Sequence, residues 1–198
     1  MIPESLYHIY NRGNNKQRIF FQERNYHYFL RKVKVQLTPY LEILAYCLMP
    51  NHFHFLAFSK GDINTKKYST SLGKLLSSYT RAIQNQEGLV GSLFQQNTKA
   101  KDVNDLEYAQ TCFHYIHQNP LKSKLVKKME DWPHHSFNEY WKGEKGICNV
   151  ALAIELLAIP TTQDQFYRES YNVVTGDYSL PWLSGSTTSS GGTTSITK

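Results

Sequence analysis

The sequence predicts an α+β fold in which helices cover an antiparallel sheet. Apolar residues recur at helical spacing in several segments, and shorter apolar segments of strand length lie between them. The chain has 198 residues, of which 40% are hydrophobic, so it can bury the core of one domain with extensions. No apolar run approaches the length needed to cross a membrane, which predicts a protein without a membrane partner.

The first half of the chain predicts one strand, one helix and then two further strands. The expected elements are a strand at 6–11, a helix at 23–37, a strand at 41–48 and a strand from 52 to about 58. A turn rich in glycine and asparagine follows the first strand, and Pro39 separates the helix from the second strand.

The second half predicts a helix, a strand and another helix. The apolar stripe of the first helix runs from Leu72 to Ile83, the strand spans 92–103, and the last helix starts near Asp105. Pro120 disfavours the helical conformation of the residue before it, so we expect this helix to end there. The order β-α-β-β-α-β followed by a helix is the ferredoxin-like split βαβ arrangement, with an antiparallel sheet covered by helices on one face.

The composition divides the chain into three parts. Residues 1–141 hold all of these elements and form the predicted domain, and 142–183 form a C-terminal extension with a helix expected at 150–159. Residues 184–198 are a Ser/Thr/Gly tract that cannot bury enough apolar surface to order itself, so we expect a flexible tail.

The charge of the chain favours a polyanionic partner without identifying one. The net charge is +6 and the pI is about 9.1. Fourteen tyrosines, ten phenylalanines and three tryptophans suit base stacking on single strands, although most of them are expected in the core. Three cysteines, an odd number without metal-type pairing, predict a reduced, cytoplasmic protein in which they are structural.

His52 and His54 form the most informative pair in the sequence. They lie two residues apart in an apolar run of strand type, so both imidazoles should point to the same face, roughly 6 to 7 Å apart. Two ring nitrogens at this separation can converge on one divalent cation. The alternative is that the strand simply carries two hydrogen-bonded histidines.

Tyr115 lies on the helix predicted to start near Asp105, roughly opposite its apolar stripe. Asn119, four residues on, and Gln118, three residues on, are its neighbours on the helix surface. The helix C-terminus carries partial negative charge, which favours a bound cation nearby. One strand therefore offers two imidazoles, and one helix end offers a phenol and an amide oxygen.

At these positions the chain resembles a known family. The matching blocks are Tyr7–Asn15, Leu48–Leu56, Gly91–Gln95, Tyr115–Pro120 and Trp132-Pro133. Together they resemble the HUH single-strand transposases that use one tyrosine, most closely the REP-associated tyrosine transposases. The resemblance covers about residues 5–141 and rests on Leu-Met-Pro-Asn-His-x-His followed by Tyr-Ile-x-x-Asn-Pro.

The resemblance implies DNA transposition: an endonuclease and strand transferase that cuts single-stranded or hairpin DNA through a 5′-phosphotyrosine. Tyr115 would be the nucleophile, and His52 and His54 would hold Mg²⁺ or Mn²⁺. Related transposases often use a glutamine four residues after the tyrosine as the third ligand. Here that position is Asn119, which we favour, and Gln118 is the alternative.

DNA-contacting residues are inferred from chemistry and from the resemblance together. They are expected in the first turn and along the strand at 92–103, where polar and basic residues alternate. The candidates are Arg12, Asn14, Gln95, Asn97, Lys99 and Lys101. Family members often carry Arg-Phe-Lys where this chain has Asn97-Thr98-Lys99, so a sequence preference cannot be carried over at that point.

Other functions and roles remain open at this stage. A catalytically silent DNA- or RNA-binding module of the same fold is the main alternative, and a replication-type nickase is a remote one. His8 is expected to be a hydrogen-bonded histidine of the sheet, and His117 a core residue. The sequence does not decide between a monomer and a homodimer.

Overall fold

The computed structural model describes residues 1–172. The predicted tail at 184–198 and the last residues of the predicted extension lie outside this described part.

Four strands form one antiparallel sheet in the order β2-β3-β1-β4. The strands are β1 (Leu6–Arg12), β2 (Leu41–Met49), β3 (His52–Ser59) and β4 (Lys99–Asp102). The helices are α1 (Glu23–Gln36), α2 (Thr65–Glu87), α3 (Leu106–Lys122), α4 (Phe137–Trp141), α5 (Val150–Leu157) and α6 (Gln163–Asn172). Two 3₁₀ turns are η1 (Asn14–Lys16) and η2 (Met129–Asp131). The α+β, ferredoxin-like prediction is confirmed.

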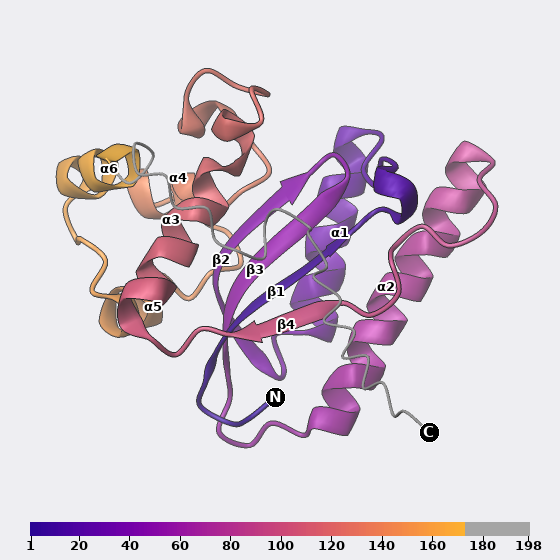
Figure 1. Cartoon of the computed structure of the whole chain (residues 1–198), viewed down its shortest axis with the longest axis horizontal. Coiled ribbons are helices and arrows are strands. Elements are labelled where there is room, and N and C mark those ends of the chain that lie inside the picture. Colours follow the sequence, from indigo (N-terminus) through magenta and orange to yellow (C-terminus); the bar gives the residue numbers. More distant parts are fainter. Residues whose placement is uncertain (173–198) are drawn as a thin grey trace, which may run out of the picture.

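The sheet lies between two helical layers (Figure 1). On one face, residues such as Phe53 and Phe55 pack with the buried sides of α1 and α2. On the other face, α3 lies against β2 and β3 and shares a second core with α5 and α6. The sequence predicted one covered face, and the structure adds this second layer over half of the other face.

Capping side chains set the starts of the long helices. Asn64 accepts a hydrogen bond from the backbone N–H of Lys67 at the start of α2, and Asp105 does the same for Tyr108 at the start of α3. Helix α2 ends at Gly88, whose φ of 67° lies in the left-handed region that glycine tolerates.

Helix α3 does not end before Pro120, as the sequence predicted, but runs through it to Lys122. Pro120 is buried, so tertiary packing outweighs the conformational bias on the residue before it. The backbone N–H of Ser123 then donates to the Asn119 carbonyl at 2.9 Å and closes the last turn. One more turn of helix therefore follows the Tyr115–Asn119 segment.

The strand predicted at 92–103 is wrong in its length, because only Lys99–Asp102 are regular. Asn97 has a φ of 60°, which breaks the extended conformation. Upstream of this break, Phe94 makes only an isolated bridge to Gly13. The alternation of side chains expected from Gln95 to Lys101 therefore does not continue across the break.

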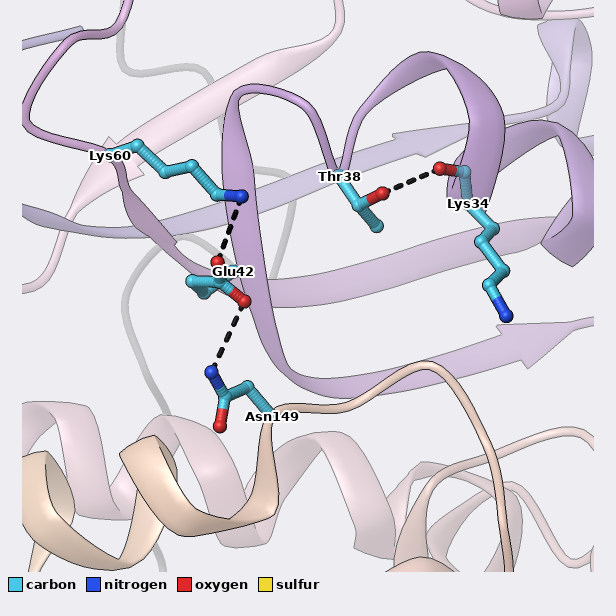
Figure 2. A network of polar contacts seen from close by, with 5 residues as sticks. All are labelled: Lys34, Thr38, Glu42, Lys60 and Asn149. Carbon is cyan, nitrogen blue, oxygen red and sulfur yellow. Dashed lines mark hydrogen bonds and ion pairs between the residues drawn. The ribbon is translucent and has the colours of Figure 1, made fainter.

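The predicted extension is, up to Asn172, part of the folded core. Ala153 and Leu157 of α5 are fully buried, and so is Phe166 of α6, a helix that the sequence did not predict. Figure 2 shows how the segment before α5 is held: Glu42 accepts from Asn149 at 3.2 Å and pairs with Lys60 at 2.9 Å. In the same view, the Thr38 hydroxyl donates to the Lys34 carbonyl at 2.6 Å where α1 ends.

The described residues also bear on the expectations for membrane-spanning helices and for the cysteines. Within residues 1–172, no helix is both long and apolar enough to traverse a bilayer. Cys47, Cys112 and Cys148 are free thiols, and the first two are buried, in keeping with the structural role predicted for them.

Candidate functional site

The two histidines of β3 point to the same face of the sheet, as their spacing predicts. Their ring centroids lie 5.0 Å apart and the rings are nearly perpendicular. His54 is buried, with 5% of its surface exposed, whereas His52 is half-buried at the end of the strand. A tight connection over Pro50 and Asn51 leads from β2 into β3, so the pair lies at one end of the β2–β3 hairpin.

Helix α3 places Tyr115 beside this pair. The Tyr115 ring stands edge-on to the His54 ring, with 5.9 Å between their centroids. Helix α3 packs on this face of β2 and β3 through Cys112, Phe113 and Ile116. The phenol and both imidazoles therefore belong to one chain.

Asn119 links the phenol to the histidines. Its side-chain amide hydrogen-bonds the ring of His52 and the side chain of Tyr115, and its Nδ2 donates to the Tyr115 backbone carbonyl at 2.9 Å. Gln118 points elsewhere: its Nε2 donates to the Ser170 carbonyl of α6 at 2.9 Å, and the side chain is 1% exposed. The structure thus brings Asn119 to the histidines and places Gln118 against α6.

Burial dominates the electrostatics of the histidines. It lowers the pKa of His52 to about 4, with a smaller contribution from the Arg12 guanidinium and an opposing one from the Asn119 hydrogen bond. Burial likewise holds the pKa of His54 well below its usual value, and the neighbouring His52, His8 and Arg12 act in the same direction. Both imidazoles are therefore neutral at pH 7, which is the form that binds metal ions.

Burial also raises the pKa of Tyr115 above that of a free phenol, and the hydrogen bond from Asn119 partly offsets this. The Lys122 ammonium lies 5.5 Å from the centroid of the Tyr115 ring. It reaches this position because α3 continues past Pro120, which brings the residue seven positions after the tyrosine onto the same side of the helix. A positive charge beside the ring favours the phenolate.

The donor set fits a divalent cation that takes two nitrogen ligands and completes its coordination with oxygen. His52 Nδ1 lies 2.6 Å from the Asn51 side-chain oxygen, so Nδ1 carries the proton and Nε2 keeps its lone pair. In the described part of the chain, no group of three or more His, Cys, Asp or Glu side chains is placed to hold a metal ion. A cation here would therefore need an amide, water or phosphate oxygen besides the imidazoles.

Three of the six expected DNA-contacting residues lie on the β1–β4 side of the same face. In the strand register Arg12 is opposite His52, while Lys99 and Lys101 of β4 are opposite Tyr10 and His8 of β1. Both lysines are exposed, so positive charge extends from the histidine pair toward the edge of the sheet.

The remaining three candidates lie on the loops beyond the strand ends. Asn14, in the turn after β1, is exposed, and its backbone N–H donates to the Leu93 carbonyl at 2.9 Å. Gln95 and Asn97, in the segment before β4, are also exposed. They do not share one strand face with Lys99, because of the break at Asn97.

Three further residues lie at the site. The sequence favoured a hydrogen-bonded sheet histidine at His8 over one that lines the site, and it assigned no role there to Tyr10 or Lys122. Tyr10 stacks on His8, with 4.7 Å between the ring centroids, and its ring lies 5.9 Å from that of His54. His8 pairs directly with His54, and Lys122 approaches Tyr115. The sequence did carry a signal for His8 and Tyr10. They alternate with Arg12 along β1, so all three side chains must lie on one face of the strand.

A ferredoxin-like sheet with a His-x-His pair on a central strand, and a tyrosine on the following helix, is the architecture that the resemblance to HUH tyrosine transposases predicts. The fold is also that of a solved structure, a REP-associated tyrosine transposase bound to a REP hairpin. The match has a TM-score of 0.57 and 22% sequence identity, and it covers 74% of this chain and 85% of that chain.

A sequence comparison leads to the same family. A Haemophilus influenzae protein, provisionally described as a REP-associated tyrosine transposase, is 25% identical over 112 residues, or 52% of this chain. The match spans 62% of that relative's length. No family model matches the chain. The resemblance to REP-associated tyrosine transposases is thus confirmed.

Proposed function

We propose that this chain cuts and rejoins single-stranded DNA next to a hairpin, as a transposase that uses Tyr115 as its nucleophile. The observation that carries the proposal is the meeting of Tyr115 with His52, His54 and Asn119 in one folded chain. A protein that only binds nucleic acid has no need of a phenol beside two neutral, buried imidazoles.

In the first step, the Tyr115 oxygen attacks a backbone phosphorus. The new bond joins the phenol oxygen to phosphorus, the bond from phosphorus to the 3′ oxygen breaks, and the phenol proton passes to water. The products are a 5′-phosphotyrosyl chain and a free DNA 3′-hydroxyl. A second 3′-hydroxyl can attack the phosphotyrosine and release the tyrosine, which rejoins DNA without an external energy source.

His52 and His54 would hold Mg²⁺ or Mn²⁺, with Asn119 as the protein's oxygen ligand. When bound, such a cation stabilises negative charge on the phosphate and favours the ionised phenol. Asn119 has a second task, because its amide orients the Tyr115 side chain. Lys122 would supply positive charge beside the Tyr115 ring.

The proposed substrate follows from the surface next to the site. Arg12 would contact a phosphate near the cut, and Lys99 and Lys101 would follow the strand toward the sheet edge. The solved relative is bound to a hairpin, and we propose a hairpin with single-stranded flanks for this chain too.

A labelled hairpin oligonucleotide tests this function. A 3′-end label stays with the fragment that becomes attached to protein, so a labelled band that migrates with the denatured protein reports the adduct. We expect the band with wild type and Mn²⁺, its loss in EDTA, and its loss in Tyr115→Phe. Tyr108→Phe is the matched control, because its hydroxyl accepts from Lys101 at 2.9 Å near the same surface.

Two outcomes would contradict the proposal. Hairpin binding without any adduct or cleavage across several hairpins would assign the chain to the binding-only alternative. An adduct that persists in Tyr115→Phe would mean that another tyrosine is the nucleophile.

A further inference from the structure

His8 of β1 and His54 of β3 form a direct imidazole pair inside the protein. His8 Nε2 lies 2.9 Å from His54 Nδ1, and the two rings are stacked with 5.0 Å between centroids. The exposed fraction is 0% for His8 and 5% for His54. The pair is therefore shielded from water and has a fixed geometry.

At 2.9 Å the two nitrogens are hydrogen-bonded, so one of them donates a proton to the other. If His8 donates it, His54 Nδ1 is the acceptor, and His54 carries its own proton on Nε2, which then cannot bind a metal ion. If His54 donates it, His54 Nε2 keeps its lone pair and is available as a ligand. The arrangement of this hydrogen bond thus decides whether His54 can act.

His52 shows the same pattern with a different partner. Its Nδ1 lies 2.6 Å from the Asn51 oxygen, which can only accept, so His52 uses Nδ1 as a donor and keeps Nε2 for a ligand. Each imidazole of the His-x-His pair thus makes one hydrogen bond through Nδ1. Metal-binding histidines generally donate their other ring N–H to such a partner, which fixes the ring and its tautomer.

We propose that His8 is a positioning residue that accepts the His54 Nδ1–H and so keeps His54 Nε2 available to bind the divalent cation. This inference rests on the proposed function and extends it to a residue outside the His-x-His motif. In the strand register His8 is opposite Leu56, two residues after His54. His8 is fully buried, so it contacts His54 inside the protein and does not contact DNA.

Three variants test the role of His8 in the full-length protein. His8→Phe keeps a flat ring but removes the acceptor, whereas His8→Gln retains an acceptor oxygen at a similar reach. His114→Phe is the matched control, because it removes another buried imidazole, 6% exposed, from α3 on the side facing α6. Mn²⁺ affinity is measured by calorimetry without DNA, and hairpin affinity by anisotropy in EDTA.

We expect His8→Phe to weaken Mn²⁺ binding by about 10- to 100-fold, the usual effect of losing such a partner. His8→Gln should restore most of the affinity, and His114→Phe should bind Mn²⁺ as wild type does. Hairpin affinity in EDTA should stay the same in all variants. Adduct formation by His8→Phe should approach the wild-type rate as Mn²⁺ is raised.

Wild-type Mn²⁺ affinity in His8→Phe would overturn this role and leave the proposed function standing. A wild type that binds no Mn²⁺ and forms no adduct would overturn the proposed function itself. If His8→Phe does not fold, ring ¹⁵N NMR of wild type decides: a protonated His54 Nδ1, with Nε2 responding to Mg²⁺, is expected. A protonated Nε2 that does not respond to Mg²⁺ would refute the role.

Discussion

Acid should destabilise this protein earlier than its carboxylates alone would require, because several histidines are buried in neutral form. His114 is a clear case, since it lies on α3 away from the proposed ligands. Burial lowers its pKa from 6.5 to about 4, and the Glu169 carboxylate opposes this only in part. In the unfolded chain the same imidazole takes up a proton near its ordinary pKa.

The sign and size of the effect follow from these values. Between about pH 6.5 and 4 the unfolded chain binds a proton at residue 114 that the folded protein does not, so the free energy of unfolding falls as the pH falls. One pKa unit corresponds to about 1.4 kcal/mol, so at about pH 5 this residue alone removes about 2 kcal/mol. That is a large part of a total stability of about 5–15 kcal/mol.

Urea unfolding at pH 7 and pH 5 measures this contribution. In His114→Phe, the loss of unfolding free energy between the two pH values should be smaller than in wild type by about 2 kcal/mol, whatever the variant's own stability. His27→Phe removes an exposed histidine of α1 and serves as the control for the loss of an imidazole. An unchanged pH dependence in His114→Phe would refute the reasoning.

Other substitutions test the site and the core separately. Asn119→Ala should weaken Mn²⁺ binding by about tenfold in calorimetry, whereas Gln118→Ala should leave it unchanged and lower the unfolding free energy by about 1–3 kcal/mol, since it loses a buried hydrogen bond; the reverse result would exchange their roles. Lys122→Met should slow adduct formation by about two- to fivefold and move its pH–rate profile to higher pH, because a cation is lost beside the Tyr115 phenol. An unchanged profile would exclude this role for Lys122. Phe113→Ala should lower the unfolding free energy by about 3–5 kcal/mol through the cavity it leaves, and a smaller loss would mean that the second core closes around the gap.

The order of helices and strands was predictable because each long element has its own apolar periodicity and is bounded by turn residues such as glycine, asparagine and proline. The shared face of His52 and His54 was equally predictable, because the alternation of a strand is local geometry. That Tyr115 would lie beside them came from the resemblance and not from local pattern. The position of one element on another depends on packing across the whole sheet.

What the sequence did not predict depends on distant partners. The His8–His54 pair needs the register of β1 against β3. No hairpin turn fixes that register, because α1 and β2 lie between these two strands in the chain. Helix α6 has few apolar residues, and its order depends on Phe166 entering a core built by α3 and α4. Pro120 stays helical because its surroundings are buried, which overrides a purely local preference.

Phenol and imidazoles that come from the same polypeptide make every copy of the protein self-sufficient in its proposed chemistry. In a mixture of wild-type and Tyr115→Phe protein, the variant copies would then not affect the wild-type copies. The rate of adduct formation would therefore fall in direct proportion to the fraction of variant protein. A site shared between two subunits would respond more steeply, so titrating intact protein with Tyr115→Phe protein separates the two designs.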